Sequence, residues 1–502
     1  MSPSKFSAGN SCYLGPILFN PGGPGESGVD YLLAYEPYFR AIIGPQYDLV
    51  GFDPRGVGAT TPFLSLFNSP AEALEFYSTL PFNVNDSVSA LGRLYAQTKI
   101  LGELALDRAR TVAESVGTAA VATDMLQIAR AFGQDNVNYW GISYGSVLGA
   151  TFAAMFPQNV GRFIIDGVSD SHEWYYSAQD TSSLLETDAA LTSVYDACVA
   201  AGPSKCALWA NTTGAIRTRV DSDLTTLHQA PVPIYNSTDP RAITFAVADY
   251  PLAFWQLFLT TYYPYNTGAG AAAAFAALER GDGAPIYAGS IASSIAALDT
   301  CAAAGAPFVA GLLDVTSPIF CGDSLVEKRR TLAEAKEDYE AMSKISPFAA
   351  SWYATFVGPC ATWPIKAKDR FNGSFETNTS TPLLLISNTL DPVTPIQSGR
   401  KMSQGFHGSV LLQQNSTGHS SLSGFSTCTA LAIRAYFQAG ALPAAGTVCQ
   451  PDTAIFDAPN NSSGFGGVTL GARAADALGL GEARRVQREA TFLHRRASGF
   501  PL

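Results

Sequence analysis

A serine between two glycines is the first feature of this chain that could do chemistry. The segment NYWGISYGSVLGA, residues 138–150, places Ser143 in a Gly-x-Ser-x-Gly pattern, which can also arise by accident in a chain with 45 glycines. Aromatic and β-branched residues precede it and favour a strand, while an apolar segment that ends at Pro157 follows it and favours a helix. Such a strand-to-helix turn would strain Ser143 and expose its hydroxyl, which indicates a nucleophile.

A nucleophilic serine needs a base, and the base needs an acid to orient it. Among the five histidines, only His419 follows a clear strand and a tight turn. Another strong strand, residues 382–387, precedes Asp391. Both side chains would then stand with Ser143 at the carboxyl edge of a parallel sheet, where α/β proteins build their sites. The order serine, acid, histidine therefore predicts a catalytic triad.

Alternatives to this triad remain open. Asp391 precedes a proline and could be an ordinary turn residue, and His419 could be a histidine of a surface loop. A rival acid, Asp166 or Asp170, follows the strand at residues 162–165, where some hydrolases carry the acid. The remaining histidines are His172, His228, His407 and His494.

A serine nucleophile also requires N–H donors for the oxyanion that forms when it attacks a carbonyl group. The backbone N–H of Tyr144 is one, because this residue directly follows the nucleophile. The second is expected from an early loop, NPGGPGESG at residues 20–28, and we assign it to Gly23, next to Gly22. The glycine spacing of this loop does not fit a phosphate-binding loop, and no lysine follows it.

Several segments together resemble the tripeptidyl-aminopeptidase-like branch of the proline iminopeptidase family of serine peptidases, which are α/β-hydrolases. They are NPGGPGESG, GFDPRGVGATTP at 51–62, YWGISYGSVLGATFAAMFP at 139–157, NTLDPVTP at 388–395 and STGHSSL at 416–422, and the match spans most of residues 15–450. The resemblance implies the same nucleophile, acid and base, with Gly22 and Gly23 in the oxyanion loop.

Three further residues near these segments are candidates for the site. Asp53 and Arg55 lie in a turn that looks like the Asp-x-Arg-Gly turn of the family, where they would fix loops beside the site. We favour a buried structural ion pair as the larger part of their role. Glu26 stands where a small residue is expected. Its carboxylate would either bind the amino group of a substrate or point into solvent, and we favour solvent.

The predicted architecture is an α/β-hydrolase fold, with a mostly parallel sheet flanked by helices and a large, mostly helical cap inserted before the strand of the acid. The interval between Ser143 and Asp391 is far longer than one strand and helix require. The expected divisions are a core at 1–171 and 381–458, a cap at 172–380, and a linker with a tail at 459–502. Helices are expected in the cap at residues 191–201, 271–280 and 332–345.

The beginning of the chain departs from the family pattern. Few residues precede the strand that leads into the oxyanion loop, so the first hairpin of the sheet is expected to be missing, which would expose a sheet edge. The segment MSPSKFSAGNSCYL also lacks the apolar region of a signal peptide. If this short beginning is genuine, a cytoplasmic location is expected.

Cysteines and glycosylation sequons point the other way, to secretion. The eight cysteines show no zinc-type pairing, and local spacing favours disulfides Cys198–Cys206 and Cys428–Cys449. Sequons of the form Asn-x-Ser/Thr occur at Asn85, Asn211, Asn236, Asn372, Asn378, Asn415, Asn460 and Asn461. On balance we expect a secreted, disulfide-bonded glycoprotein.

The charge of the chain limits its partners. A formal net charge of −11 argues against nucleic acid and anionic membranes, and no apolar stretch reaches the roughly 18 residues of a membrane span. The predicted chemistry needs no metal or organic cofactor. The sequence does not predict an oligomeric state.

By resemblance, the expected substrate is a peptide with a free N-terminus, from which short units are removed through an acyl-enzyme. The alternative is an esterase, lactonase or thioesterase that uses the same triad on a small acyl substrate. A more remote alternative is a hydrolase fold that only binds its ligand.

Overall fold

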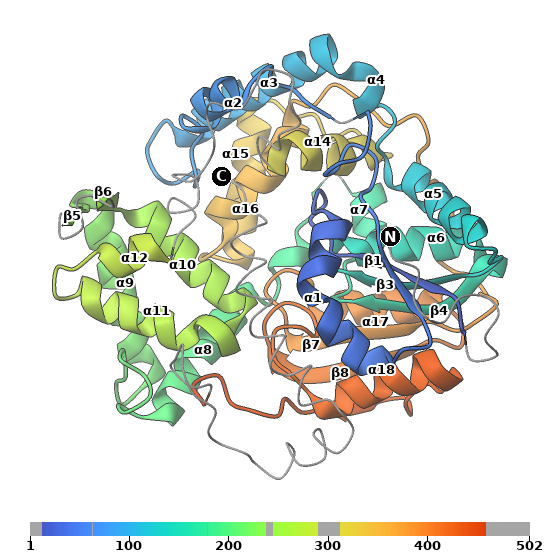
Figure 1. Ribbon diagram of the computed structural model, residues 1–502. Helices are drawn as coiled ribbons and strands as arrows, with labels where there is room; N and C mark the ends of the chain where they lie inside the picture. Colours follow the sequence, from blue (N-terminus) through green and yellow to red (C-terminus); the bar gives the residue numbers. More distant parts are fainter. Residues whose placement is uncertain (1–12, 63, 178, 237–243, 290–311, 458–502) are drawn as a thin grey trace.

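The computed structural model describes residues 13–62, 64–177, 179–236, 244–289 and 312–457 (Figure 1). Within these residues a seven-stranded sheet has the order β2-β1-β3-β4-β7-β8-β9, and every neighbouring pair is parallel. The strands are β1 (Pro16–Asn20), β2 (Asp48–Gly51), β3 (Val137–Ile142), β4 (Val160–Asp166), β7 (Leu384–Leu390), β8 (Val410–Thr417) and β9 (Val448–Cys449). The predicted α/β-hydrolase fold class is confirmed.

Helices cover both faces of this sheet. On one face α1 (Gly28–Ile43) and α18 (Thr427–Ala439) pack on Phe19, Trp140 and Ile386. On the other face α5 (Thr118–Ala131), α6 (Tyr144–Met155) and α17 (Ile396–Gly405) pack on Phe163 and Leu385. Successive strand residues thus enter opposite hydrophobic clusters, which explains why the central strands are almost entirely apolar.

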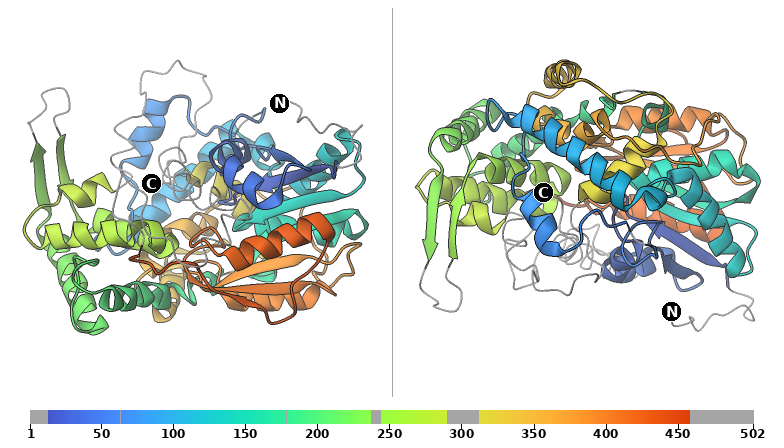
Figure 2. Two further views of the ribbon diagram at one scale, coloured as in Figure 1. Left: turned by 60° about the horizontal axis from the view of Figure 1, so that its bottom comes forward. Right: turned by 90° about the horizontal axis from the view of Figure 1, so that it is seen from above.

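Between β4 and β7 the chain forms a mostly helical body beside the sheet (Figures 1 and 2). Its elements are α7 (Ser171–Tyr176), η2 (Ser182–Leu184), α8 (Thr187–Ala201), α9 (Thr213–Gln229), β5 (Val232–Asn236), β6 (Thr244–Ala248), α10 (Tyr250–Tyr262), α11 (Pro264–Leu278), α12 (Ala284–Ala288), α14 (Leu312–Asp323), α15 (Leu332–Ile345), α16 (Ala350–Val357) and η3 (Gly358–Ala361). The predicted helices correspond to α8, α11 and α15. The cap boundaries at 172 and 380 remain a prediction.

A second helical excursion lies between β2 and α5, where the sequence indicated only core. It consists of α2 (Pro70–Tyr77), α3 (Ala90–Arg108) and α4 (Arg110–Ala113). Figure 1 shows α2 and α3 beside α15 and α16 rather than over the sheet. The Tyr95 hydroxyl of α3 donates to the Arg330 carbonyl at 2.9 Å. Helices from two separate parts of the chain therefore contact each other beside the sheet.

Disulfides join three pairs of cysteines within the described residues. Cys198–Cys206 and Cys428–Cys449 confirm the two pairs expected from local spacing. A third, Cys321–Cys360, links the end of α14 to η3. Cys12 and Cys301 lie outside the described residues.

Within the described residues no strand precedes β1, and the four-residue β2 forms one edge of the sheet. No described helix is long and apolar enough to cross a membrane. The expected linker and tail at 459–502 lie outside the described residues.

Candidate active site

Ser143 lies in the sharp turn between β3 and α6, where its backbone has φ 59° and ψ −123°. A positive φ costs a residue with a side chain on the order of 1–3 kcal/mol. Close packing enforces the turn: a Cβ on Gly141 would lie 2.3 Å from the Gly145 carbonyl oxygen. The Ser143 N–H donates to the Asp166 carbonyl at 2.9 Å, so the turn rests on the end of β4. Ser143 is partly exposed, whereas the residues on either side of it are buried.

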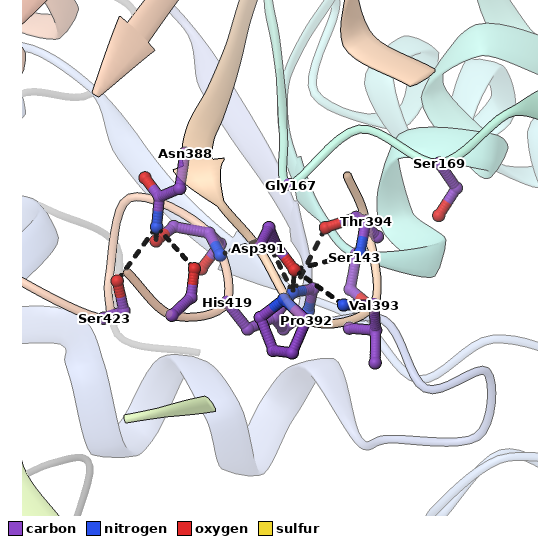
Figure 3. Close-up of polar contacts among 12 residues, drawn as sticks. Ser143, Gly167, Ser169, Asn388, Asp391, Pro392, Val393, Thr394, His419 and Ser423 are labelled. Carbon is purple, nitrogen blue, oxygen red and sulfur yellow. Dashed lines mark hydrogen bonds and ion pairs between the residues drawn. The ribbon is translucent and has the colours of Figure 1, made fainter. Parts of the chain in front are cut away.

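Asp391 follows β7, is fully buried and faces His419 (Figure 3). Its two carboxylate oxygens lie 3.0 and 3.1 Å from His419 Nδ1. The carboxylate also accepts the backbone N–H groups of Val393, Thr394 and Ser420 at 3.1, 2.9 and 2.9 Å. Burial raises the pKa of Asp391, but the charge of His419 and these hydrogen bonds outweigh it, and the net pKa is lowered. The carboxylate therefore stays ionised at neutral pH and can orient the imidazole.

His419 sits in the loop after β8 and is only 6 % exposed. The Thr394 hydroxyl lies 3.2 Å from its Nδ1, beside the carboxylate of the acid. The His419 N–H donates to the Tyr262 carbonyl at 2.9 Å, and the Tyr262 ring meets the imidazole edge-on at 5.0 Å between centroids. The end of α10 is therefore in direct contact with the histidine.

The charge of this histidine is governed by its surroundings. Burial lowers the pKa of His419, but the charge of Asp391 and the hydrogen bond to it raise the pKa. The carboxylates of Asp166 and Glu26 add smaller contributions in the same direction, and the net pKa is raised. The Asp391 carboxylate would therefore stabilise the imidazolium that forms when His419 takes up a proton.

The end of β4 connects the histidine with the serine turn. Gly167 follows Asp166, and a Cβ on Gly167 would lie 3.3 Å from His419 Cε1. Within the described residues no hydrogen bond joins the Ser143 hydroxyl to His419, and such bonds are often long before substrate binds. Ser143, Asp391 and His419 stand at the carboxyl ends of β3, β7 and β8, while their joint catalytic role stays a prediction.

The loop after β1 packs against the serine turn. A Cβ on Gly22, whose φ is 111°, would lie 2.8 Å from the Ser143 Cβ and 3.0 Å from the Tyr144 nitrogen. The Gly22 N–H donates to Asn20 Oδ1 at 3.1 Å, whereas the Gly23 N–H makes no hydrogen bond within the described residues. The Tyr144 N–H opens α6, where helix N–H groups lack intrahelical partners. Gly23 and Tyr144 remain the predicted oxyanion donors.

Asp53 and Arg55 do not form the buried ion pair that we favoured from sequence. Arg55 pairs with Asp124 of α5 through two hydrogen bonds of 2.6 and 2.7 Å, and its side chain is 42 % exposed. Asp53 instead accepts the Ser27 hydroxyl at 2.6 Å and the Val29 N–H at 3.2 Å. It thereby ties the end of the oxyanion loop to the start of α1.

The rival acids have other partners. Asp166 accepts the N–H and the hydroxyl of Ser421 at 2.9 and 2.5 Å. Asp170 caps α7 and pairs with Lys401 at 2.6 Å. In the described structure the carboxylate that contacts the His419 ring is that of Asp391.

Glu26 is partly buried on the oxyanion loop. Burial is the main reason why the pKa values of Tyr31 on α1 and Tyr262 on α10 are raised, and the Glu26 charge adds to the effect at both residues. The same charge acts on His419. Glu26 therefore lies within electrostatic range of the histidine, and the role of its carboxylate stays a prediction.

Two family models match the chain. One, described as alpha/beta hydrolase fold, matches residues 15–223 and includes Ser143 and the oxyanion loop. The other, described as TAP-like protein, matches residues 344–449 and includes Asp391 and His419. The chain has the α/β-hydrolase fold, and its C-terminal part resembles the TAP-like branch. Its parallel sheet and the order of its candidate triad agree with this fold.

Named relatives of this α/β-hydrolase have more than one activity. Serine protease Hip1 of Mycobacterium tuberculosis is 26% identical over 460 residues, covering 87% of this chain and 81% of its own. Tripeptidyl aminopeptidase of Streptomyces coelicolor is 26% identical over 448 residues, which cover 87% of this chain and 76% of the relative. Carboxylesterase B of Mycobacterium tuberculosis is 28% identical over 457 residues, which cover 87% of this chain and 80% of the relative. All three names denote hydrolases, two acting on peptides and one on esters.

Three side chains at the site of this hydrolase escaped sequence reasoning. Thr394 and Asn388 lie inside NTLDPVTP, but only the acid of that segment was singled out. Tyr262 belongs to an aromatic stretch of the expected cap, and the sequence does not show which of these aromatic residues reach the site. An amide residue within a strand that begins with apolar residues, as at Asn388, is the signal that could have been used.

The pH dependence of this hydrolase should reflect the raised pKa of His419. The base must be neutral to accept a proton, so kcat/KM should rise with pH around a midpoint above the ordinary histidine pKa of about 6.5. Because the charge of Glu26 raises the pKa, Glu26→Gln should move this midpoint to lower pH. Profiles of kcat/KM for both proteins test this, and a wild-type midpoint well below that of free histidine would contradict it.

Proposed function

We propose that this α/β-hydrolase is a serine aminopeptidase that releases short, tripeptide-like units from the free N-terminus of peptides. The observation that carries the proposal is the buried Asp391–His419 pair at the sheet edge that also bears the strained turn of Ser143. The TAP-like match and the names of two relatives support a peptide substrate.

In the proposed mechanism His419 takes the proton of the Ser143 hydroxyl as its oxygen attacks the scissile carbonyl carbon. Asp391 holds the imidazole tautomer and stabilises the imidazolium, while the N–H groups of Gly23 and Tyr144 bind the oxyanion. The C–N bond breaks, the leaving amine takes the proton from His419, and the acyl unit remains on Ser143 as an ester. His419 then takes a proton from water, whose oxygen attacks the ester carbon. The ester C–O bond breaks, the Ser143 oxygen takes the proton back from His419, and the acyl unit leaves as a carboxylic acid.

We place the free amino group of the substrate near Glu26. The carboxylate is partly buried and close enough to act on His419, so an ammonium bound there would lie near the reacting carbonyl group. The edge of the site also bears the aromatic ring of Tyr262. A carboxylate beside an aromatic ring is a favourable environment for an ammonium group.

We further propose that the helical body between β4 and β7 acts as the cap and limits access to the site. Two contacts support this role. The Tyr262 carbonyl accepts the N–H of His419, and the Thr316 hydroxyl donates to the Pro24 carbonyl in the oxyanion loop at 2.8 Å. Because both the base and the oxyanion loop are contacted, extended peptides should enter and folded proteins should be poor substrates.

An esterase is the second candidate function, favoured by the relative named carboxylesterase B. The same triad cleaves small esters, lactones and thioesters, and the shape of the pocket decides among them. A protein that only binds its ligand would not react with a serine-directed fluorophosphonate, which separates that remote alternative from both enzymes.

Three substrates distinguish these functions on the purified chain: a tripeptide anilide with a free amine, its N-acetylated counterpart, and a short acyl ester. The proposal expects cleavage of the free-amine peptide and little cleavage of the acetylated one. Turnover of the ester with both peptides untouched would refute the peptidase and favour the esterase. Cleavage of both peptides would retain the peptidase but reject the requirement for a free N-terminus.

Glu26→Gln tests the amine site. Loss of the carboxylate should lower kcat/KM for the free-amine peptide by about 10- to 100-fold, because a charged hydrogen bond is worth about 1.5–3 kcal/mol. Turnover of the acyl ester should change little. Glu36→Gln on α1, where the carboxylate pairs with Arg40, is the matched control and should leave both activities unchanged. Equal losses for peptide and ester would assign Glu26 to the triad rather than to the substrate amine.

We also propose that the protein is exported to an oxidising compartment. The three disulfides support this, since such bonds rarely persist in the cytosol. Sequons add support, because every sequon asparagine whose side chain is described is exposed: Asn85, Asn211, Asn372, Asn378 and Asn415. Peptide mapping of the protein purified from its host, with and without glycosidase, would detect the glycans.

A further inference from the structure

The loop that carries His419, residues 417–424 and called here the histidine loop, has an irregular backbone. Gly418 and Ser420, on either side of the histidine, have φ values of 111° and 61°. Ser420 and Ser143 are the non-glycine residues with positive φ in the described part of the chain. Such backbone conformations are unfavourable and persist only when surrounding contacts enforce them. The position of the imidazole therefore depends on the contacts of its two neighbours.

Asn388, a buried residue of β7, holds both of these neighbours. Its Nδ2 lies 2.7 Å from the Gly418 carbonyl oxygen and 2.5 Å from that of Ser420. It also lies 2.9 Å from the Ser423 hydroxyl. The carbonyl groups can only accept, so the two N–H groups of the amide are directed to the two sides of the histidine.

The orientation of the Asn388 amide follows from these partners. If its oxygen and nitrogen were exchanged, the oxygen would face two carbonyl oxygens and repel them. In the observed orientation Oδ1 is buried without a hydrogen-bond partner among the described residues, which costs stability. An apolar residue would avoid that cost, so the side chain is better explained by the loop it holds than by the packing of β7.

Two other strand side chains hold more distant parts of the histidine loop. Gln414, the register partner of Asn388 on β8, donates to the Gly424 carbonyl at 2.9 Å. Asp166 at the end of β4 binds Ser421. Among these three buried side chains, only Asn388 contacts the residues directly before and after His419.

We propose that Asn388 is a positioning residue for His419, an inference that rests on the proposed role of this histidine as the base. By fixing the carbonyl groups on both sides, it keeps Nδ1 against Asp391 and leaves Nε2 to face the Ser143 turn. Release of the loop would let the imidazole move. A displacement of about 1 Å of a catalytic group can cost about 100-fold in rate.

The test is Asn388→Ser, which is neutral, retains one donor and is too short to span both carbonyl groups. With the short acyl ester, kcat should fall by about 10- to 100-fold with KM little changed. The acidic limb of the pH profile should move to lower pH, because a loosened imidazole loses part of its contact with Asp391. The rate of labelling by a fluorophosphonate should fall in parallel with kcat.

Asn138→Asp is the matched control. Asn138 lies on β3, and its Nδ2 donates to the Pro16 carbonyl at 3.1 Å, so the substitution removes an amide-to-carbonyl bond within the sheet away from the histidine loop. It should lower the melting temperature without changing kcat or the acidic limb. A folded Asn388→Ser protein with wild-type kcat and an unshifted acidic limb would overturn the inference.

A second variant covers the case in which Asn388→Ser does not fold. Asn388→Asp has the same size, and its carboxyl group can donate one hydrogen bond only while it is protonated. Its kcat relative to wild type should therefore decline as pH rises, and a constant ratio of one would overturn the inference. Failure of both variants to fold would assign Asn388 to stability and also overturn it. A wild-type chain inert to both ester and fluorophosphonate would instead refute the proposed function.

Discussion

Ser143→Ala should reduce kcat by about 10⁴- to 10⁶-fold while leaving the fold intact. The hydroxyl is the atom that would attack the substrate, and neither neighbour of this residue exposes a group that could replace it. Alanine keeps the Cβ and the N–H that donates to the Asp166 carbonyl, so the turn should survive. Turnover of the acyl ester measures kcat, fluorophosphonate labelling reports the reactive serine, and thermal melting tests whether the fold is intact.

Ser403→Ala provides the comparison for this variant. Ser403 lies on α17, and its hydroxyl donates to the Arg400 carbonyl at 2.9 Å, outside the candidate site. The control should retain turnover and labelling. Retained turnover in Ser143→Ala, or labelling of a different serine, would remove Ser143 as the nucleophile and with it the proposed mechanism.

Much of the site could be predicted because its signals are local. The glycines around Ser143 and the apolar residues on both sides predict a strand, a turn and a helix, and β3 and α6 occupy these positions. Asp391 and His419 each follow a strand that begins with apolar residues, and parallel strands bring their ends to one edge. The order of these residues in the chain and their places at strand ends were therefore enough to predict where the candidate triad residues lie, without knowledge of any contact.

Features that depend on distant contacts could not be predicted. Disulfide Cys198–Cys206 spans 8 residues and was expected, whereas Cys321–Cys360 spans 39 and was not. A long interval leaves many pairings open, and only the fold selects among them. In the same way, the partner of Arg55 is Asp124, on a helix that the turn sequence does not reveal.

The helices between β2 and α5 illustrate a second limit. Their sequence predicts amphipathic helices but not the surface that they cover. In the structure Asn83, which lies between α2 and α3, donates from its Nδ2 to the Ser351 hydroxyl of α16 at 3.1 Å. A division of the chain by sequence intervals alone therefore assigned this segment to the core, although it contacts helices that follow β4.

The electrostatics of Glu26 depended on tertiary structure as well. From sequence, solvent was the reasonable expectation for a carboxylate in a glycine-rich loop. In the fold the charge of Glu26 acts both on Tyr262 of α10, which contacts the histidine, and on the proposed base itself. One residue then links two measurable properties, the preference for a free amine and the midpoint of the acidic limb.

Asp391→Asn should reduce kcat by about 10⁴-fold with little change in structure. Asparagine can still accept the N–H groups of Val393 and Thr394, but its NH₂ group would then face His419 Nδ1 or the N–H of Ser420. An amide donor at Nδ1 selects the tautomer with the proton on Nε2, which cannot accept the proton of a serine. The acidic limb should also move to lower pH, because the charge of Asp391 raises the pKa of His419.

Asp166→Asn is the matched comparison because it removes the charge of the rival acid from the same sheet edge. Asp166 binds Ser421 and contributes less than Asp391 to the raised pKa of His419. Its loss should lower kcat by less than about 10-fold, since the base keeps its own carboxylate. Measurement of kcat and the pH profile in both variants separates the two acids. Equal losses would mean that the carboxylate at the end of β4 shares the task of orienting the histidine, whereas a larger loss in Asp166→Asn would transfer that task to β4.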